Sequence, residues 1–521
     1  MGNQSRFSVV PTINAPRSNF KTPYRHITTC NENELVPVFT HEINPGDTIK
    51  MDMSVFGRMN TQIVPAMDNI NQDIHFFFVP NRLVWDNWEK FMGAQENPSD
   101  SIDYLIPTIN VTSTDWLEDS IFDHFGIPKP ANGSIDVSAL PFRALALIFN
   151  EWYRDQNFQD SIVIEKGDTG AFDTSTFPNY PYNLPRNKRH DYFTSALPFA
   201  QKGSPVSISL TGNAPIGSSA SSGEPLAILR DDDNKHALIG TAGITAAMGS
   251  ATGTQPSPGI LTARLDDVTA ITINKLRQAF QLQKFLERDA RSGTRYIEVI
   301  KSHFNVDNPD YRLQRPEYLG GQHNGVNVST VPQTTPDFTG SETPQGNLAA
   351  FATVSGSGHC FNKSFTEHGF IIGLMNFTAD VTYQQGLERF WSRQTRVDHY
   401  FPEFAHLGEQ TILNKEIFVT GDETDDEVFG YQERYAELRY KPDMITGKLR
   451  STDPQSLDVW HYAEEFTALP VLGADFIRQA SPIKRNVVNI DEPTFKVDIK
   501  FNLDQTKILP MFGTPGFVDH F

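Results

Sequence analysis

Two kinds of hydrophobic pattern recur along the chain, and each predicts a different kind of β-strand. In residues 48–56, and again near the C-terminal end in residues 495–504, apolar and polar side chains alternate one by one. This period of two is typical of a strand with one buried side and one solvent-facing side. Residues 74–79 (IHFFFV) and 370–377 (FIIGLMNF) are continuously apolar instead, which favours strands that are covered on both faces.

Helical spacing is rarer than strand spacing, so the pattern predicts a mainly β protein with a few helices. Residues 138–153 place apolar side chains on one stripe, and residues 274–291 carry a second stripe. Asn274 is a candidate N-cap, and Gly293 can take the left-handed position that ends a helix. Residues 83–92 (LVWDNWEKFM) predict a short third helix.

One long stretch does not look like core. Residues 203–259 are rich in Ser, Thr, Gly and Pro, and no aromatic residue occurs between Phe199 and Phe280. We interpret residues 203–259 as an insertion that projects from the main body, with a disordered linker as the alternative. Within residues 203–259, Val206, Ile208 and Leu210 suggest a short strand. Further along the chain, residues 320–347 form a second loop-rich stretch.

Strands near both ends of the chain, separated by long irregular segments, indicate one sandwich with large insertions. We expect an extended N-terminal arm over residues 1–45, followed by a single β-domain over residues 46–521 that contains the 203–259 insertion. Closing long loops is tolerable because closure entropy grows only logarithmically with length. Loops longer than ~15 residues are nevertheless uncommon in a self-sufficient domain. They usually gain order from neighbouring molecules, which favours an assembly protein.

Composition narrows the class of protein. Lys and Arg number 44 against 63 Asp and Glu, which gives a formal net charge of −19. A chain of this charge does not neutralise nucleic acid in bulk unless its basic groups are segregated onto one face. Two cysteines exclude a disulfide scaffold, and no apolar run approaches the ~20 residues of a bilayer span, so no membrane insertion is expected. The first ten residues do not resemble a signal peptide.

Motifs for catalysis, cofactor binding or metal binding are weak. The histidine spacing excludes HExxH, and the one Gly-Lys pair, Gly447-Lys448, is followed by Leu where a phosphate-binding loop needs Ser or Thr. Residues 422–433 carry oxygen side chains at EF-hand spacing, but Glu427 stands where glycine makes the turn. Cys30 and Cys360 are expected to be unreactive. We therefore expect no enzyme, no catalytic residue, no cofactor and no metal.

Basic residues are the remaining candidates for a site. Arg6, Arg17, Lys21 and Arg25 precede the first acidic residue, Glu32, and this Pro-punctuated stretch suits contact with nucleic acid. The alternative is a plain flexible terminus. Three further basic clusters follow in the chain: Arg186, Lys188, Arg189 and His190; Arg288, Arg291 and Arg295; and Arg389, Arg393 and Arg396. Aromatic residues interleave the last cluster, as in single-strand binding sites, but pairing with acids within or between subunits is the favoured interpretation.

Long strings of the sequence resemble one family. These strings are MDNINQDIHFFFVPNRLVWDNWEKFMG (67–93), HDYFTSALPFAQKG (190–203), LRQAFQLQKFLERDARSGTRYIEVIKSHF (276–304), RLQRPEYLGG (312–321), FTEHGFIIGLMNFTADVTYQQGLERFWSR (365–393), FAHLGEQTILNKEIF (404–418) and ERYAELRYKPDMITG (433–447). Together they resemble the major capsid proteins of gokushovirus-type microviruses, which are small tailless phages with single-stranded DNA. The resemblance covers nearly the whole chain and fails only in residues 203–259.

The resemblance implies a fold, a function and partners. It implies an eight-stranded viral jelly roll with long loop insertions, copied into a small T=1 icosahedral shell around single-stranded DNA. It further implies pentamer-like assembly intermediates, a host-attachment role for residues 203–259 against a bacterial surface receptor, and location in the virion after assembly in the host cytoplasm. Given the net charge, a separate small basic virion protein is expected to neutralise most of the genome. The alternatives are a jelly-roll carbohydrate-active enzyme or carbohydrate-binding protein, and a host-binding spike.

Overall fold

The computed structural model describes residues 16–95, 97–101, 103–170, 175–204, 216–218, 226–229, 235–240, 246–250, 261–263, 273–291, 301–303, 313–335 and 345–512. The chain divides into two compact units. The larger unit comprises Met1–Ala200 and Val306–Phe521, and the smaller one comprises Gln201–Asn305. Residues 203–259 lie within the bounds of the smaller unit, and their projection from the main body stays a prediction.

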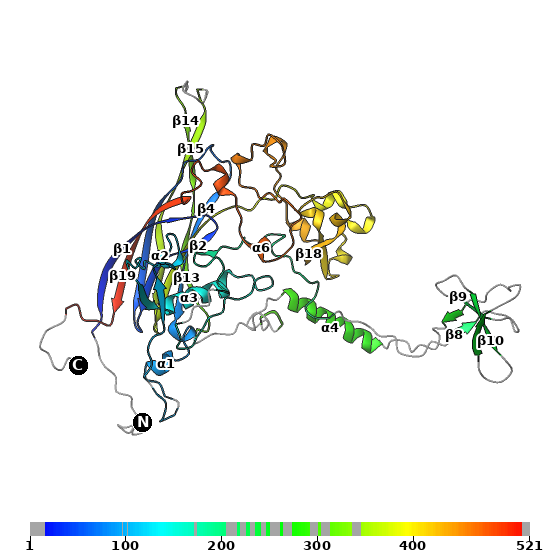
Figure 1. Ribbon diagram of the computed structural model, residues 1–521, viewed down its shortest axis with the longest axis horizontal. Coiled ribbons are helices and arrows are strands. Elements are labelled where there is room, and N and C mark those ends of the chain that lie inside the picture. Colours follow the sequence, from blue (N-terminus) through cyan, green and yellow to red (C-terminus); the bar gives the residue numbers. More distant parts are fainter. Residues whose placement is uncertain are drawn as a thin grey trace. The chain divides into compact units, whose positions relative to one another are not determined.

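Eight long strands of the larger unit form a jelly roll (Figure 1). In chain order they are β1 (Ser18–Cys30), β2 (Glu34–Ile43), β3 (Thr48–Met59), β4 (Ile70–Pro80), β13 (Glu317–Gly325), β15 (Leu348–Ser364), β16 (Gly369–Ala379) and β19 (Phe495–Lys507). Sheet 1 has the order β1-β19-β3-β15, extended at its edge by β14 (Asn327–Pro332). Sheet 2 has the order β13-β4-β16-β2, extended by β7 (Leu184–Pro185). Consecutive long strands mostly alternate between the two sheets, and all the pairs are antiparallel, as in a viral jelly roll.

The main core lies between the two sheets. Phe76 and Phe78 of sheet 2 belong to the same buried cluster as Phe501 and Met53 of sheet 1. The opposite side of sheet 2 is buried as well, because Phe77 and Val79 belong to a second cluster that lies under the insertion. The continuous apolar runs therefore mark the sheet with two covered faces, as their pattern predicts.

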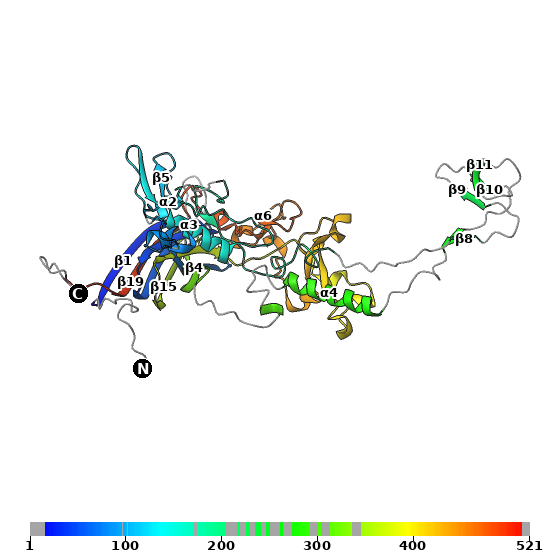
Figure 2. The same cartoon turned by 90° about the horizontal axis from the view of Figure 1, so that it is seen from below.

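The two sheets differ in whether their outer sides are covered by other parts of the chain. The outer side of sheet 2 is covered by the insertion that follows β4, which includes β5 (Thr108–Thr112), α2 (Ile121–His124) and α3 (Leu140–Ile148). Figure 2 shows these elements on one side of the sandwich and β1, β19 and β15 on the other. On β3 and β19, buried and more exposed residues alternate along the strand. Within the larger unit, sheet 1 thus keeps one outer face that no described part of that unit's insertions covers, which we call the open face.

Two insertions hold most of the irregular chain. The first, between β4 and β13, also contains α1 (Trp88–Phe91), β6 (Ser134–Ser138) and a π-helical turn at Phe149–Tyr153 that continues α3. The second, between β16 and β19, contains β17 (Glu409–Leu413), β18 (Val428–Glu433), α6 (Ala474–Ile477) and several short 3-10 turns. Aromatic residues from both insertions, including Phe193 and Phe476, form a third buried cluster.

The described residues of the smaller unit include short strands and a long helix. Strands β9 (Leu226–Leu229), β10 (Lys235–Gly240) and β11 (Ala246–Ser250) form a three-stranded sheet, and β8 (Ile216–Ser218) pairs with β12 (Leu261–Ala263). Helix α4 (Ile273–Arg291) carries Arg288 and Arg291 in its last turn, where cations interact favourably with the helix dipole. The helix predicted over residues 274–291 is confirmed.

Three expectations need correction or lie outside the structure. Residues 1–45 do not form one arm ahead of the sandwich, because β1 and β2 supply a strand to each sheet. The first part of the stretch 320–347 is not loop, because β13 pairs with β4 and β14 pairs with β15 despite their Gly and polar content, and residues 336–344 lie outside the described residues. The short strand suggested by Val206, Ile208 and Leu210 lies outside the described residues.

Candidate nucleic-acid interface

The open face of sheet 1 is built from alternate side chains of four paired strands. Because side chains of a strand point to opposite sides in turn, the residues between the buried ones share this face. The members used below are Lys21, Arg25 and Ile27 of β1; Lys496, Asp498, Lys500, Asn502 and Asp504 of β19; Lys50, Asp52, Ser54, Phe56 and Arg58 of β3; and Phe351, Ser355, Ser357 and His359 of β15.

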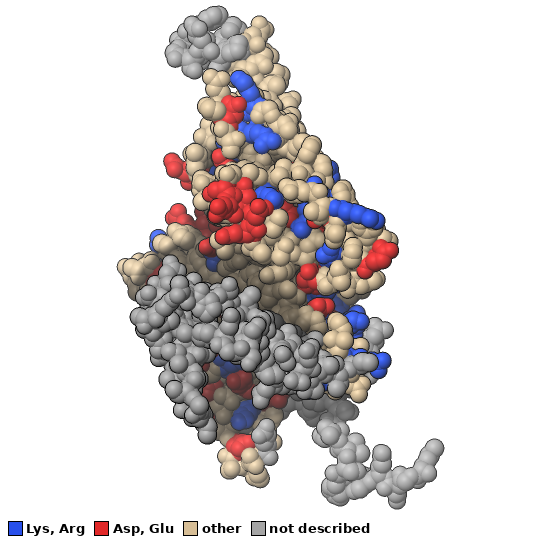
Figure 3. Space-filling model, turned by 90° about the vertical axis from the view of Figure 1, so that its right-hand side faces the viewer, with Lys and Arg blue, Asp and Glu red and all other residues tan. Residues whose placement is uncertain are grey.

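The open face has the opposite charge balance to the whole chain. It carries six lysines and arginines against three aspartates, whereas the full sequence has 44 basic and 63 acidic residues. Acidic side chains gather elsewhere, for example in a patch on the side of the molecule drawn in Figure 3. The basic groups are therefore segregated onto one face, which is the condition under which an acidic chain can bind phosphate.

Like charges face each other across neighbouring strands of the open face. Arg25 of β1 is directly opposite Lys500 of β19, and Lys496 of β19 is directly opposite Arg58 of β3. Direct like-charge pairs across strands are destabilising. These two rows lie four residues apart along β19, which is about 13 Å. These two bands of positive charge reduce the stability of the sheet, but they can bind an extended polyanion.

Part of this charge is compensated within the chain. Arg25 donates to Asp498 from Nε at 2.7 Å, Lys496 lies 2.9 Å from Glu492, and Lys50 lies 4.0 Å from Asp52. The hydrogen bond from Arg25 lowers the pKa of Asp498, so this carboxylate stays charged. Within the described chain, no carboxylate lies within ion-pair distance of the other three cations on this face, which are Lys21, Arg58 and Lys500.

Aromatic rings accompany these cations. The side chain of Phe56 is 52% exposed and that of Phe351 is 37% exposed, and the Arg58 guanidinium lies 5.9 Å from the centre of the Phe351 ring. Exposed rings beside free cations are the combination that binds single strands, because bases stack on the rings while the cations hold phosphate. Ser54, Ser355 and Ser357 add hydroxyl groups between the charged rows.

The structure brings together only some of the predicted contact residues. Lys21 and Arg25 lie on the open face, Arg17 is exposed just before β1, and Arg6 lies outside the described residues. Sequence reasoning missed Lys50, Arg58, Lys496 and Lys500. Lys50, Lys496 and Lys500 occupy polar positions of the predicted alternating strands, and Arg58 lies just beyond the first of them. The pairing of β19 with β1 on one side and β3 on the other was not predictable from the pattern.

Two arginines of the last basic cluster are paired with acids within the chain. Arg389 lies 2.8 Å from Glu416, Arg393 lies 3.2 Å from Glu437, and the Arg396 guanidinium lies over the Phe401 ring. The interpretation of this cluster as paired charge therefore holds for Arg389 and Arg393. Arg295 lies outside the described residues.

The residues considered for other chemistry are engaged locally. Asp422 accepts hydrogen bonds from Thr420 and Thr424, which lower its pKa. Both cysteines are free and buried, and burial raises the pKa of Cys360 to about 12, so its thiol is not nucleophilic at neutral pH. Among the described residues, no group of three His, Cys, Asp or Glu side chains is placed to hold a metal ion.

Known proteins resemble this chain over its whole length. Residues 8–517 match the family model described as capsid protein (F protein). The chain is 46% identical to capsid protein VP1 of Bdellovibrio phage phiMH2K over 100% of this chain and 99% of that protein. It is 39% identical to capsid protein VP1 of Chlamydia phage 1, over 98% of each chain, and 39% identical to that of Spiroplasma virus 4, over 98% and 97%. Nothing in these matches supports the carbohydrate-active enzyme, and no helix in the described ranges has the length and apolarity needed to cross a membrane.

Proposed function

The chain belongs to the family of phage capsid proteins, and from this premise we propose that it closes into a T=1 icosahedral shell with the open face turned toward single-stranded DNA. As a capsid protein it is a structural component of the virion and assembles with copies of itself around the genome. The observation that supports the orientation is the contrast between the sheets. Within the larger unit, the first insertion covers sheet 2, whereas the open face of sheet 1 is polar, cation-rich and not covered by described residues of that unit's insertions.

The amount of DNA packaged per particle tests directly whether the open face contacts the genome. The test compares virions or virus-like particles of the parent with a Lys21→Gln, Arg58→Gln, Lys500→Gln variant. We expect shells to form in similar yield, because the substitutions do not touch the sandwich core. Their DNA content should fall, because three cations that can contact phosphate are lost. A matched control changes three exposed cations elsewhere, Lys166→Gln, Arg439→Gln and Lys448→Gln. Equal losses in both variants, or none in the first, would count against the open face as the DNA contact.

We propose the residues ahead of β1 as a second DNA contact. Arg6 and Arg17 precede Lys21 and Arg25, and β1 leads from them directly into the open face. Changing Arg6 and Arg17 to Gln should lower packaged DNA further when combined with the open-face variant, without lowering the yield of empty shells. Unaltered genome content in the combined variant, relative to the open-face variant alone, would exclude this stretch.

We also propose two partners. An excess of three cations per chain on the open face is small against a genome, so a separate small basic virion protein should carry most of the neutralising charge. Mass spectrometry of purified virions should reveal a second protein with a strongly basic sequence. Virions that contain DNA but only acidic proteins would contradict this expectation.

The smaller unit is our candidate for attachment to a bacterial surface receptor. It is supported by the separation of Gln201–Asn305 from the sandwich unit and by the lack of aromatic residues in 203–259. Replacing residues 203–259 with a short Gly/Ser bridge should leave particles intact and abolish their adsorption to host cells. Failure to form any particle would show that this segment is needed for assembly instead.

A further inference from the structure

The basic run Arg186–His190 belongs to the first insertion and lies beside the second insertion and the end of β16. Its backbone is held from both sides. The Arg186 N–H donates to the Asn33 carbonyl at 2.8 Å, and the Arg186 carbonyl accepts from the Gln479 N–H at 2.9 Å. The next cation is fixed in the same way, because the Lys188 N–H donates to the Ile477 carbonyl at 2.9 Å. The position of Arg186 is therefore set by the backbone and does not depend on a side-chain partner.

The polar side chains next to Arg186 each have a partner inside the chain. Lys188 forms a buried ion pair with Glu464 at 2.6 Å, and Arg189 lies 2.8 Å from Asp73. Asn187 donates to the Tyr153 carbonyl at 2.7 Å. Lys188 and Arg189 are thus paired with acids within the chain.

Unlike Lys188 and Arg189, Arg186 has no carboxylate within ion-pair distance among the described residues. Its guanidinium lies 5.0 Å from the centre of the Tyr153 ring, and no described residue accepts a hydrogen bond from it. Burial lowers the pKa of Arg186, and the attraction of the nearby Asp73 charge, which is itself paired with Arg189, does not offset this effect. A guanidinium has five N–H donors, so most of its hydrogen-bonding capacity is left over.

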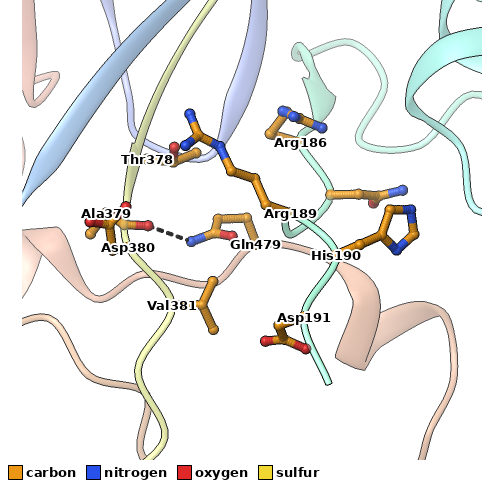
Figure 4. Close-up of a pocket in the computed structure, with 10 residues that line it drawn as sticks. Arg186, Arg189, His190, Asp191, Thr378, Ala379, Asp380, Val381 and Gln479 are labelled. Carbon is orange, nitrogen blue, oxygen red and sulfur yellow. Dashed lines mark hydrogen bonds between the residues drawn. The ribbon is translucent and has the colours of Figure 1, made fainter. Parts of the chain in front are cut away.

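Arg186 and Arg189 line a common pocket of about 170 Å3 (Figure 4). Figure 4 shows the arginine-bearing segment on one side, the end of β16 with Thr378 and Asp380 on the other, and Gln479 between them. The walls of the pocket therefore come from the first insertion, from sheet 2 and from the second insertion.

The carboxylates of the pocket do not compensate Arg186. Asp191 accepts from the Tyr383 hydroxyl at 2.9 Å and from the backbone N–H groups of Phe193 and Thr194 at 2.9 and 2.7 Å. Asp380 accepts from the Asn71 side chain at 2.9 Å. Both acids are held by other donors, which leaves the guanidinium N–H groups available to an incoming anion.

We propose that this pocket binds a phosphate-type oxyanion, either free phosphate or a phosphodiester, and that Arg186 is its main ligand. A tetrahedral oxyanion presents acceptors in several directions, so it can contact Arg186 and Arg189 from one wall and the Thr378 hydroxyl from the other. A planar carboxylate offers two oxygens in one plane and fits donors on opposite walls less well. The bound anion joins both insertions to the end of β16. This inference is independent of which way the open face points.

Titration calorimetry on the purified full-length protein tests this site. The probes are inorganic phosphate, a thymidine dinucleotide and acetate, compared at equal ionic strength. We expect phosphate binding that weakens at least about tenfold in Arg186→Met, because a charge-assisted hydrogen bond is lost. Arg439→Met, which removes an exposed cation paired with Glu433, should leave it unchanged. Dinucleotide binding that is also lost in Arg186→Met would identify a phosphodiester as a ligand, and phosphate binding alone would identify the free ion.

Thermal melting of the unmodified protein keeps the inference testable if Arg186→Met does not fold. Phosphate should raise the melting temperature above that in chloride of equal ionic strength, because a ligand that binds only the folded state stabilises it. Arg186→Lys keeps the charge but loses the fork of donors, and should show a smaller increase. Equal melting in both salts, an increase unaffected by Arg186→Lys, or stronger binding of acetate than of phosphate would each overturn the proposal.

Discussion

Single charged residues inside this protein are held by specific partners, and Lys188 is the clearest example. Its ammonium lies 2.6 Å from Glu464 and 4.3 Å from the centre of the Phe476 ring, and both charged side chains are almost fully buried. Burial is the largest cause that raises the pKa of Glu464, while Lys188 opposes it. The pair fixes the first insertion to the second at the third buried cluster.

Lys188→Met should destabilise the protein by about 3–5 kcal/mol at pH 8, because it leaves the Glu464 charge buried without its partner. Loss of Lys188 raises the pKa of Glu464 further above its ordinary value of 4.5. A carboxyl whose folded-state pKa is raised favours folding below 4.5 and loses that contribution as pH rises through the raised pKa. The deficit should therefore shrink as pH falls from 8 toward 4.5.

Denaturant unfolding of the unassembled chain over this pH range measures the effect. Lys441→Met is the matched control, because Lys441 pairs with Glu388 at the surface, and it should cost less than about 1 kcal/mol at every pH. A deficit for Lys188→Met that stays constant or grows toward pH 4.5 would rule out Glu464 as its cause.

Individual site residues were partly predictable from the sequence. Lys21 and Arg25 were selected because no acid precedes Glu32, and both lie on the open face. Lys500 was not selected, although it occupies a polar position in the most regular strand. Lys500 matters because Arg25 lies directly opposite it on the neighbouring strand. The register between strands that are hundreds of residues apart cannot be predicted from local residue spacing.

Among the secondary-structure elements, β1 has a larger role than the sequence indicated. It pairs with β19 over its whole length, from Ser18 opposite Lys507 to Cys30 opposite Phe495. Without β1, β19 would become an exposed edge strand with a row of unpaired backbone groups. The start of the chain is therefore part of the sandwich from residue 18 onward.

Stepwise truncation distinguishes an arm from a strand. Removing residues 2–15 should leave the protein folded and able to assemble, because β1 stays intact. Removing residues 2–30 should cause aggregation or loss of assembly, since the edge of β19 is then uncovered. Soluble yield and particle formation measure both effects, and normal particles from the longer truncation would show that β1 is dispensable.

Gly320 of β13 is required by a close backbone approach. A Cβ atom at this position would lie 2.2 Å from the Cys360 carbonyl oxygen, and the residue has a φ of +152° next to an irregularity in the pairing of β13 with β4. Gly320→Ala should therefore destabilise the protein by about 1–3 kcal/mol. Gly325→Ala, in the same strand but with open space around the new Cβ, is the control and should cost clearly less in the same unfolding measurement.

The types of most elements could be predicted, because period is a local property. The alternating pattern of β3 and β19 and the continuous runs of β4 and β16 distinguished a sheet with one covered face from a sheet with two. Strand β13 was missed because its Gly, Gln, His and Asn residues carry little strand preference. Strand β14 contains Val and Thr but is short, ends in a proline and lies in a stretch with repeated Pro and Thr. They form strands because β4 and β15 offer edges to pair with, which is a tertiary effect.

For the whole molecule, segregation of charge matters more than net charge. The chain has a formal charge of −19, yet its open face has twice as many cations as carboxylates. Binding to single-stranded DNA should therefore depend on salt through the few cations of this face. Each neutralised phosphate contributes about 0.7 to the slope of log affinity against log salt.

The Lys21→Gln, Arg58→Gln, Lys500→Gln variant should reduce the magnitude of that slope by about 2. The measurement is fluorescence anisotropy of a labelled DNA strand with the unassembled full-length protein at several salt concentrations. The Lys166→Gln, Arg439→Gln, Lys448→Gln control should keep the parental slope. A parallel decrease in both variants would mean that binding follows total charge and not this face.

The most direct test of the whole account is a cryo-electron microscopy reconstruction of particles assembled from this protein. We predict closed icosahedral shells in which β1, β19, β3 and β15 present the open face to the interior, with density for nucleic acid against Lys500 and Arg58. Shells with that face on the exterior, or a protein that never closes into a container, would contradict the account.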